Sequence, residues 1–390
     1  MNLVETAQEQ AFRERVRGWM QAKLQGEFAP LRGVGAMGSR GDDAALVKRW
    51  EQQLASGGWI GLDWPRAHGG QALPLAMQLI FHEEYVRCGG PGRLGHIGET
   101  LLGPTLIALG TPAQQQRFLP GILQATSYWA QGYSEPGAGS DLAGIRTRAT
   151  LDEHTGEWVL HGQKVWTSWA RESDWIFVLA RCEPPSPQRA RHAGMVFLLV
   201  PLNQPGVETR PIRQITGSAE FNEVFFDGAR TAGDLHVGQP GQGWAVAMHL
   251  LMAERGASTL GQQAAFQREL DAVITLARSN GAARDPLLRQ RIAQAALGLQ
   301  TLRSHALRVC GEDAPQRAAS VSKYAWSNWR RALGELAIDV LGADGGTAHE
   351  DALRQSLQQL WLVSRADTIY AGSNEIQCNI IAERVLGMPR

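Results

Sequence analysis

Apolar residues near the start of the chain recur at helical spacing. The apolar positions i, i+4, i+7 and i+8 are Phe12, Val16, Trp19 and Met20, and charged residues lie between them. This is the pattern of an amphipathic helix. Similar patterns predict further helices over 43–56 and 75–87, and from Thr111 to near 120–121. Thr111 is a suitable N-cap, and the proline after it suits the first helical position. Residues 1–128 are therefore predicted to form an all-α domain.

The period of the pattern changes at Trp129. Short runs rich in β-branched and aromatic residues follow, separated by turn residues, at 158–161, 175–180, 195–200 and 223–226. Such runs predict an antiparallel β-barrel or sandwich over residues 129–237.

From residue 238 the helical period returns and continues to residue 390. Trp244, Met248, Leu251 and Met252 form one apolar stripe, and helical segments are predicted near 264–277, 286–307, 316–341 and 351–363. Long helices with short connections predict a four-helix-bundle-like domain. The expected fold class is therefore α+β, with a helical, a β and a second helical domain.

Composition narrows the choice of partner and compartment. The 390 residues include 38 Lys+Arg and 38 Asp+Glu, so no basic surplus indicates nucleic acid or an acidic membrane. The four cysteines lie far apart without a Cys-x-x-Cys pair, which argues against a metal site. The charged N-terminus does not resemble a signal peptide, and no stretch approaches a membrane span. We expect a cytoplasmic protein with a small-molecule or protein partner.

The stretch from Glu135 to Asp141, Glu-Pro-Gly-Ala-Gly-Ser-Asp, has the composition of a loop that brings backbone N–H groups close to a ligand. It is not a dinucleotide fingerprint, because Leu142 stands where the third glycine would be needed. Followed by Trp166, the loop indicates a site for a phosphate-bearing aromatic cofactor. Alone, it is compatible with several ligands.

Several motifs in order resemble the acyl-CoA dehydrogenase family of FAD-dependent enzymes, over essentially the whole chain. They are Gly110-Thr111-Pro112 with Phe118-Leu119-Pro120, residues 134–141 and 162–168, Gly241 to Trp244, and residues 369–386. The resemblance implies that FAD is the cofactor. It also implies that Gln131, Tyr133 and Ser134 bind the isoalloxazine ring, that Trp166 flanks it, and that Ser168 bonds near N5. Ser140 matches a position near the pantetheine arm of the substrate.

The C-terminal motif departs from the family pattern. Medium-chain-type relatives carry Tyr-Glu-Gly-Thr, whose glutamate removes the α-proton of the thioester, whereas this chain has Tyr370-Ala371-Gly372-Ser373. A smaller group, including isovaleryl-CoA dehydrogenase, carries its base in a Glu-Arg pair on an earlier helix. Glu254 and Arg255 match that pair, so the resemblance implies that Glu254 is the base.

Other members of the C-terminal motif keep implied roles. The backbone N–H of Ala371 would polarise the thioester carbonyl, and Arg255, Tyr370 and Gly372 would contact the substrate. Ser373 and Glu375 are placed at the cofactor, although this pair also fits a helix cap.

The predicted cofactor interface departs from the pattern as well. Relatives carry an Arg-x-x-Phe-Gly segment that reaches the FAD of a neighbouring subunit, and here only Arg284 and Arg289 are candidates for that arginine. Asp339 and Gly342 lie where relatives have a Gln-x-x-Gly-Gly-Asn run at the adenine half.

The implied reaction is the α,β-dehydrogenation of an acyl-CoA to a trans-2-enoyl-CoA, with hydride transfer to flavin N5 and electrons leaving to an electron-transfer flavoprotein. The assembly is expected to be a homodimer or homotetramer, with a heteromer as the alternative. Two other hypotheses remain open: a non-catalytic FAD- or acyl-CoA-binding subunit of a heteromeric dehydrogenase, and a flavin monooxygenase on the same fold. The Glu-Arg-Gly-Ala context at 254–257 weakly favours dicarboxyl-, branched- or sterol-derived acyl groups.

Overall fold

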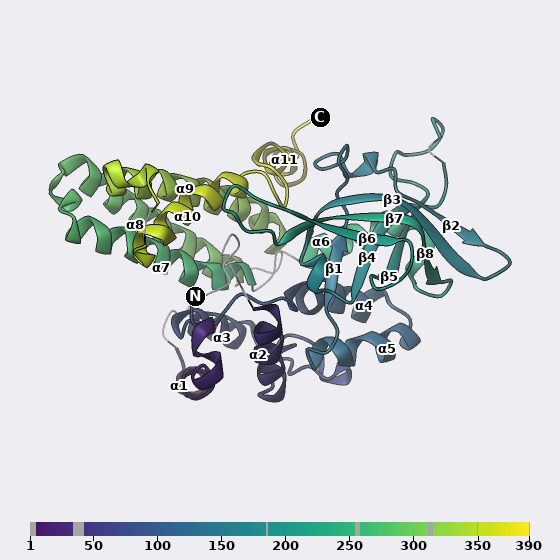
Figure 1. Cartoon of the computed structure of the whole chain (residues 1–390), viewed down its shortest axis with the longest axis horizontal. Helices are drawn as coiled ribbons and strands as arrows, with labels where there is room; N and C mark the ends of the chain where they lie inside the picture. The colour runs from purple at the N-terminus through teal and green to yellow at the C-terminus, as the bar shows by residue number, and fades with distance from the viewer. Residues whose placement is uncertain are drawn as a thin grey trace.

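The chain folds into a helical N-terminal region, a β-sheet middle region and a helical C-terminal region (Figure 1). The predicted fold class is therefore confirmed. The structure is a computed structural model, and it describes residues 5–33, 43–184, 186–253, 258–310, 315–348 and 350–389.

Local sequence signals account for the N-terminal helices. These are α1 (Ala7–Lys23), α2 (Ala44–Ser56), α3 (Leu75–Arg87), α4 (Gly103–Leu109) and α5 (Pro112–Leu123), with a π-helical turn η3 (Gly98–Leu102) before α4. Phe12, Val16 and Met20 are buried as the pattern predicts. Thr111 caps α5 as expected, but the predicted end near 120–121 is wrong: α5 continues past Pro120 to Leu123. A proline so near the end removes only one N–H from the final turns, which the helix tolerates.

The middle region is one eight-stranded sheet. Its strands are β1 (Trp129–Gly132), β2 (Arg148–Asp152), β3 (Glu157–Ser168), β4 (Trp175–Arg181), β5 (Met195–Pro201), β6 (Val207–Ile212), β7 (Phe221–Ala232) and β8 (His236–Gly241). The order is β6-β7-β3-β2-β4-β5-β8, with β1 paired to β4. The pairings are antiparallel except that β1 and β2 both run parallel to β4, so the sheet is mixed.

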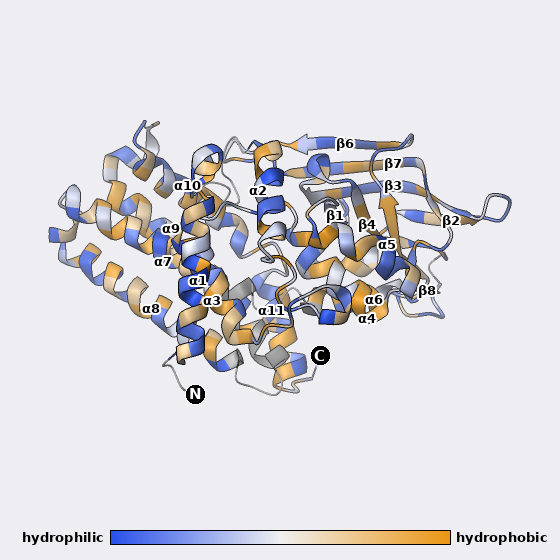
Figure 2. Ribbon diagram, turned by 90° about the horizontal axis from the view of Figure 1, so that it is seen from below, coloured by the Kyte–Doolittle hydropathy of each residue, from blue (hydrophilic) through white to orange (hydrophobic). Residues whose placement is uncertain are grey.

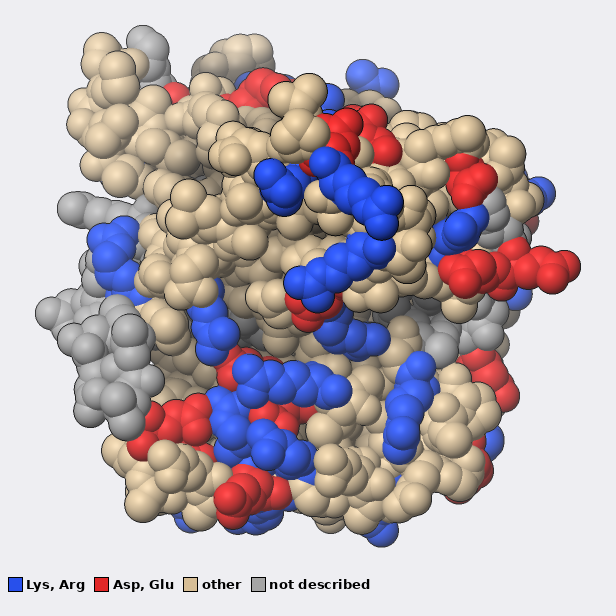
Figure 3. Space-filling model, turned by 90° about the vertical axis from the view of Figure 1, so that its left-hand side faces the viewer, with Lys and Arg blue, Asp and Glu red and all other residues tan. Residues whose placement is uncertain are grey.

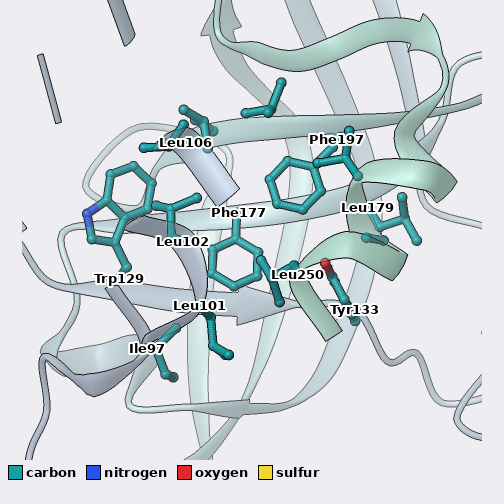
Figure 4. Packing of buried hydrophobic residues seen from close by; sticks show 14 of the residues in the cluster. Ile97, Leu101, Leu102, Leu106, Trp129, Tyr133, Phe177, Leu179, Phe197 and Leu250 are labelled. Atoms are coloured by element: carbon teal, nitrogen blue, oxygen red, sulfur yellow. The ribbon is translucent and has the colours of Figure 1, made fainter. Parts of the chain in front are cut away.

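Strand β4 is buried on both faces, which is why it contains a continuous apolar run rather than an alternating one. Ile176 and Val178 pack inside the sheet with residues of β3 and β7. Phe177 points the other way, toward α4, α5 and α6, and stacks on Phe197 of β5 at 5.4 Å between ring centroids. Figure 4 shows this second cluster, in which Trp129, Phe177 and Leu250 come from three different elements. The cluster fixes β1, and the loop that follows it, on the N-terminal helices.

The C-terminal region begins with α6 (Gly243–Ala253) and continues through α7 (Ser258–Ser279), α8 (Pro286–Cys310), α9 (Pro315–Leu341), α10 (Ala352–Asp367) and α11 (Asn374–Ile380). Helices α7 to α10 form the predicted bundle around a shared apolar core. Helix α6 instead packs against the sheet and α4 (Figure 2). Its buried residues are Val246, Ala247 and Leu250, whereas the predicted stripe members Trp244, Met248 and Leu251 are only partly buried.

Ion pairs join the bundle to the N-terminal helices. Glu83 of α3 accepts hydrogen bonds from Arg13 of α1 and from Arg303 of α8, at 2.9 and 3.2 Å. Its neighbour Glu84 is almost fully buried and binds Arg13 and Arg17. Figure 3 shows basic and acidic side chains interleaved on this side of the molecule. Glu84 is the residue of this ion-pair group that is most shielded from solvent, so breaking its ion pairs should reduce stability most.

Candidate functional site

A buried ion pair holds the Gly-rich loop in place. After β1 the backbone of Glu135 forms a reciprocal pair of hydrogen bonds with Ala138, both at 3.0 Å, which closes a tight turn. The Glu135 carboxylate accepts from Lys164 Nζ at 2.9 Å and from the N–H groups of Arg146 and Thr147. Lys164 Nζ also donates to the Tyr133 carbonyl at 3.0 Å. One lysine on β3 thus ties both ends of the Tyr133–Glu135 segment to the sheet.

The electrostatics favour an ionised pair at neutral pH. Burial lowers the pKa of Lys164 to about 8, although the charge of Glu135 opposes that shift. Burial raises the pKa of Glu135, but the neighbouring Lys164 ammonium outweighs this and leaves its pKa below the ordinary value. Sequence reasoning missed this pair. A signal was present, because Lys164 has the same strand parity as the buried residues Trp158 and Leu160.

The residues expected at the isoalloxazine ring lie at the end of β1, with Gln131 inside the strand and Tyr133 and Ser134 directly after it. Gln131 and Ser134 are half-buried, and the Ser134 carbonyl accepts from Val165 N at 2.9 Å. The Tyr133 ring is turned into the core between Phe177 and Phe197 (Figure 4). A contact from Tyr133 to a flavin would therefore come from its backbone and not from its buried ring.

Trp166 is the least expected feature of the sheet. It occupies a β-bulge where β3 and β7 change register, between the pairs at Lys164 and Thr167. Its backbone has φ +59°, in the left-handed region, and its side chain is 57% exposed. Left-handed backbone is disfavoured for a tryptophan, and bulges re-aim side chains next to functional sites. An indole that is exposed and held in a disfavoured backbone conformation is typical of a surface against which an aromatic ligand binds. Ser168 follows on the same strand and is half-buried.

The C-terminal motif is anchored by a second buried charge network. The Tyr370 hydroxyl donates to Asp367 Oδ1 at 2.7 Å. Asp367 is fully buried and pairs with Arg330, which also forms a bidentate pair with Glu269 at 2.7 and 2.9 Å. Because its hydroxyl is engaged in the bundle, Tyr370 would contact a substrate through its ring or backbone.

The three residues after Tyr370 form a sharp turn. Ala371 has φ +50° and Gly372 φ +85°. A Cβ on Gly372 would lie 2.5 Å from Gln377 Nε2, so this position requires glycine. Ser373 caps α11, its hydroxyl accepting from Ile376 N. Hydrogen bonds lower the pKa of Glu375 in the first turn. Capping by Ser373 is therefore observed, with Glu375 in the first turn of α11, while a cofactor role for the pair stays a prediction.

The remaining predicted residues lie in two other places. Asp339 of α9 pairs with Arg291 of α8 at 2.6 Å, and Gly342 begins the exposed turn after α9 with φ +62°. Ser140 is exposed at the end of the Gly-rich loop. Glu254 and Arg255 lie outside the described residues; they directly follow Ala253, the last described residue of α6.

A cleft of about 240 Å³ lies beside the Gly-rich loop. Its lining includes residues 143–146 together with Arg181, Arg189 and Arg191. Arg191 also pairs with Asp141 at 2.6 Å. Arg189 pairs with Glu183, and Arg181 donates to the backbone carbonyls of Ala143 and Ile145. These guanidinium groups therefore hold the walls of the cleft together.

The described residues contain no group of three or more His, Cys, Asp or Glu side chains that could hold a metal ion. None of the described helices combines the length and apolar character needed to cross a membrane.

Comparison with known proteins covers nearly the entire chain. Models of the acyl-CoA dehydrogenase N-terminal, middle and C-terminal domains match residues 6–126, 130–229 and 241–386. The chain is 55% identical to acyl-CoA dehydrogenase IpdE1 of Mycobacterium tuberculosis over 381 residues, 97% of each protein. It is 53% identical to the IpdE1 of Mycolicibacterium smegmatis, over 98% of each.

Solved structures of related proteins have the same fold as this chain. The Tcur3481-Tcur3483 steroid ACAD superposes with a TM-score of 0.86 and 28% identity, covering 100% of both chains. The ChsE4-ChsE5 complex from Mycobacterium tuberculosis shares the fold, with a TM-score of 0.84, 24% identity and 100% coverage of both chains. The chain belongs to the acyl-CoA dehydrogenase family, whose members are FAD-dependent oxidoreductases.

Proposed function

We propose that this chain dehydrogenates an acyl-CoA thioester between its α and β carbons to give the trans-2-enoyl-CoA, with Glu254 as the base. The α-proton passes to the Glu254 carboxylate while a hydride leaves the β-carbon. FAD, when bound, supplies the hydride acceptor. The observation that carries the proposal is Trp166, an exposed indole in strained backbone next to a loop pinned by a buried ion pair.

The proposed flavin-binding surface, called the flavin wall, has Trp166 at its centre, and its residues fit a planar aromatic ligand. Trp166 offers an exposed indole. Ser134, whose carbonyl accepts from the neighbouring Val165 N at 2.9 Å, and Gln131 of β1 are half-buried. The proposed contacts are Gln131, Ser134, Ser168 and the backbone of Tyr133. Pinning of this segment by Lys164 keeps these donors fixed, which favours electrostatic preorganisation.

Ala371 is proposed to polarise the thioester carbonyl through its backbone N–H. An α-C–H beside a thioester is weakly acidic, so a fixed donor at the carbonyl oxygen must assist the base. Among the described residues nothing accepts a hydrogen bond from the Ala371 N–H, while its carbonyl accepts from Gln377 Nε2 at 3.3 Å. The Ala371 carbonyl, which belongs to the following peptide unit, is thus held by Gln377, while the Ala371 N–H is left without an acceptor among the described residues.

Glu254 is proposed as the base because the alternative position holds Ala371, which has no side chain able to accept a proton. Helix α6, which ends beside Glu254 in sequence, packs firmly against the sheet through Val246 and Leu250. A carboxylate that bound substrate shields from water becomes a stronger base.

The arginine-lined cleft beside the Gly-rich loop is proposed to receive the phosphate-bearing end of CoA. Arg191 of this cleft pairs with Asp141, the residue after Ser140, which is proposed to contact the pantetheine arm. Guanidinium groups bind phosphate with two parallel hydrogen bonds. Arg146 lines this cleft and is the proposed ligand, whereas Arg181 and Arg189 are already engaged by backbone carbonyls and by Glu183.

We further propose an oligomeric, cytoplasmic enzyme that passes electrons to an electron-transfer flavoprotein. The titles of the two related structures name paired gene products, Tcur3481-Tcur3483 and ChsE4-ChsE5, which supports assembly with a second, homologous subunit. Leu287 and Leu297 on α8 are 74% and 69% exposed, and apolar residues of this kind suit a subunit contact. Light scattering of the chain alone and after co-expression with a homologous subunit would separate a homomer from a heteromer.

The test of the reaction is anaerobic reduction of the bound flavin by a panel of acyl-CoAs. The wild type should lose its visible flavin absorbance with at least one of them. Glu254→Gln should keep its flavin and bind acyl-CoA, with the reduction rate lowered by on the order of 10²- to 10⁴-fold. Glu153→Gln, an exposed carboxylate in the β2–β3 turn, is the matched control and should behave as the wild type.

Unchanged reduction in Glu254→Gln would refute the base assignment. Failure of every acyl-CoA to reduce the wild-type flavin would favour the non-catalytic subunit instead.

A further inference from the structure

Strands β3 and β7 lie side by side in the sheet and change register beside Trp166 (Figure 1). The paired residues are Lys164 with Val224 before the change and Thr167 with Asn222 after it. Two residues of β3 therefore stand opposite one residue of β7. Because a bulge of this kind interrupts the ladder of backbone hydrogen bonds, other contacts must hold its backbone in place.

Asn222 supplies such contacts from β7. Its side chain is fully buried, and its amide Nδ2 donates to the Thr167 carbonyl at 3.0 Å and to the Glu220 carbonyl at 3.2 Å. The Glu220 carbonyl also accepts from Trp169 N at 2.7 Å. Trp169, like Trp166, has left-handed backbone, with φ +56°. One carboxamide thus joins the two strands at the segment that lies between two strained residues.

A buried carboxamide is a costly choice for this position. Asn222 Oδ1 and Thr167 Oγ1, on the residue paired with it, are buried, and neither has a hydrogen-bond partner among the described residues. A buried polar atom without a partner reduces stability, and an apolar side chain such as valine would avoid that cost. The two hydrogen bonds from Asn222 Nδ2 are what an apolar side chain could not replace. Holding the backbone of the bulge is therefore the contribution of this residue.

The side chain of Trp166 is supported by the same strand. Phe221, the residue before Asn222, meets the indole in an edge-to-face contact, with 6.1 Å between ring centroids and an interplanar angle of 83°. The indole is nevertheless 57% exposed, so this contact orients the ring without covering it. Strand β7 therefore holds the backbone of the bulge through Asn222 and the ring of Trp166 through Phe221.

We propose that Asn222 is a positioning residue for the flavin wall and acts through Trp166. Its two hydrogen bonds keep the bulge in the conformation that presents the indole, so that little ordering remains when a planar aromatic ligand binds. Without these bonds the bulge would occupy that conformation for only part of the time, and the apparent affinity for FAD would fall by that fraction. This inference rests on the proposed dehydrogenase function and its flavin wall.

The test measures FAD affinity by titration of the full-length apoprotein. Asn222→Ala should bind FAD about tenfold more weakly than the wild type. In the Trp166→Gly background the same change should alter the affinity by less than about twofold, because the indole that Asn222 positions is absent. Asn222→Thr, whose hydroxyl can donate one of the two hydrogen bonds, should recover part of the loss, and it replaces Asn222→Ala in both backgrounds if that variant does not fold.

Thr231→Val is the matched control, because the Thr231 hydroxyl also forms a buried hydrogen bond from β7, to the Leu199 carbonyl at 2.6 Å. It should bind FAD as the wild type does. Unchanged affinity in Asn222→Ala, with weakened binding in Trp166→Gly, would overturn the inference and leave the flavin wall intact. A loss of equal size in the Trp166→Gly background, or in Thr231→Val, would also overturn it, because either result indicates a general structural role. Unchanged affinity in Trp166→Gly would contradict the flavin wall and the inference together.

Discussion

Replacing Lys164 by methionine should destabilise the protein more than any single surface change. The variant removes the charge that neutralises Glu135 and the donor to the Tyr133 carbonyl. Breaking a buried ion pair by removing one partner costs about 3–5 kcal/mol. Glu135 would keep its bonds from the N–H groups of Arg146 and Thr147, at 2.6 and 2.9 Å. We therefore expect the lower end, about 3 kcal/mol, a large fraction of a typical domain's about 5–15 kcal/mol.

The assay is denaturant unfolding at neutral pH, with flavin affinity measured in parallel. Adding Glu135→Gln to Lys164→Met removes the orphaned charge, so the double variant should recover at least about 2 kcal/mol relative to Lys164→Met. Flavin affinity should fall with Lys164→Met, because the Tyr133–Glu135 segment loses its tether. Lys23→Met, at the exposed end of α1, is the control and should change stability by less than about 0.5 kcal/mol. The reasoning is refuted if Lys164→Met costs less than about 1 kcal/mol, or if the double variant is no more stable than Lys164→Met.

Three further predictions follow from single residues. Burial raises the pKa of Glu84, but the guanidinium groups of Arg17 and Arg13 outweigh this effect and hold the pKa at about 2. The contribution of ionised Glu84 to folding stability is therefore complete above its ordinary pKa of 4.5. That contribution is lost as the pH falls from 4.5 toward 2. Glu84→Gln should therefore be less stable by about 1–3 kcal/mol at neutral pH, a difference that shrinks on acid titration, and a constant difference would contradict the assignment. Trp166→Gly relieves the φ of +59° and should change apoprotein stability by less than about 1 kcal/mol, against about 3–5 for a core tryptophan, while flavin affinity measured by titration falls at least about tenfold. Gly372→Ala introduces a Cβ 2.5 Å from Gln377 Nε2. It should lower kcat clearly while changing the melting temperature little, and an unchanged kcat would remove Ala371 from the proposed mechanism.

Local sequence patterns were sufficient to predict the helices and strands whose formation depends on neighbouring residues. The predicted helix over 75–87 coincides with α3 (Leu75–Arg87), and the residue chosen as N-cap of α5 is the cap observed. The four apolar runs of the middle region all lie inside strands of the sheet. Each of these depends on periodicity or on a cap, which neighbouring residues fix.

The site depended on contacts between distant segments, so its details were less predictable. Lys164 and Glu135 are 29 residues apart, and no spacing rule joins a strand lysine to a loop glutamate. The bulge at Trp166 arises because β3 and β7 change register, which depends on the partner strand. Similarly, the motif identified Tyr370, but only the packing of α9 against α10 brings its hydroxyl, through Asp367, to Arg330.

The two strained residues of the site share one physical arrangement. Trp166 and Ala371 both have positive φ without being glycine, and such backbone persists only where surrounding structure over-determines it. Lys164 stands two positions before Trp166 and pairs with buried Glu135, while buried Asp367 stands four positions before Ala371 and pairs with Arg330. Buried pairs of this kind add little net stability by themselves, yet each is costly to break and so resists movement of the adjacent backbone. Their placement beside the two strained positions indicates that the charges maintain the backbone geometry of the proposed flavin-binding surface and of the turn proposed to bind the thioester carbonyl.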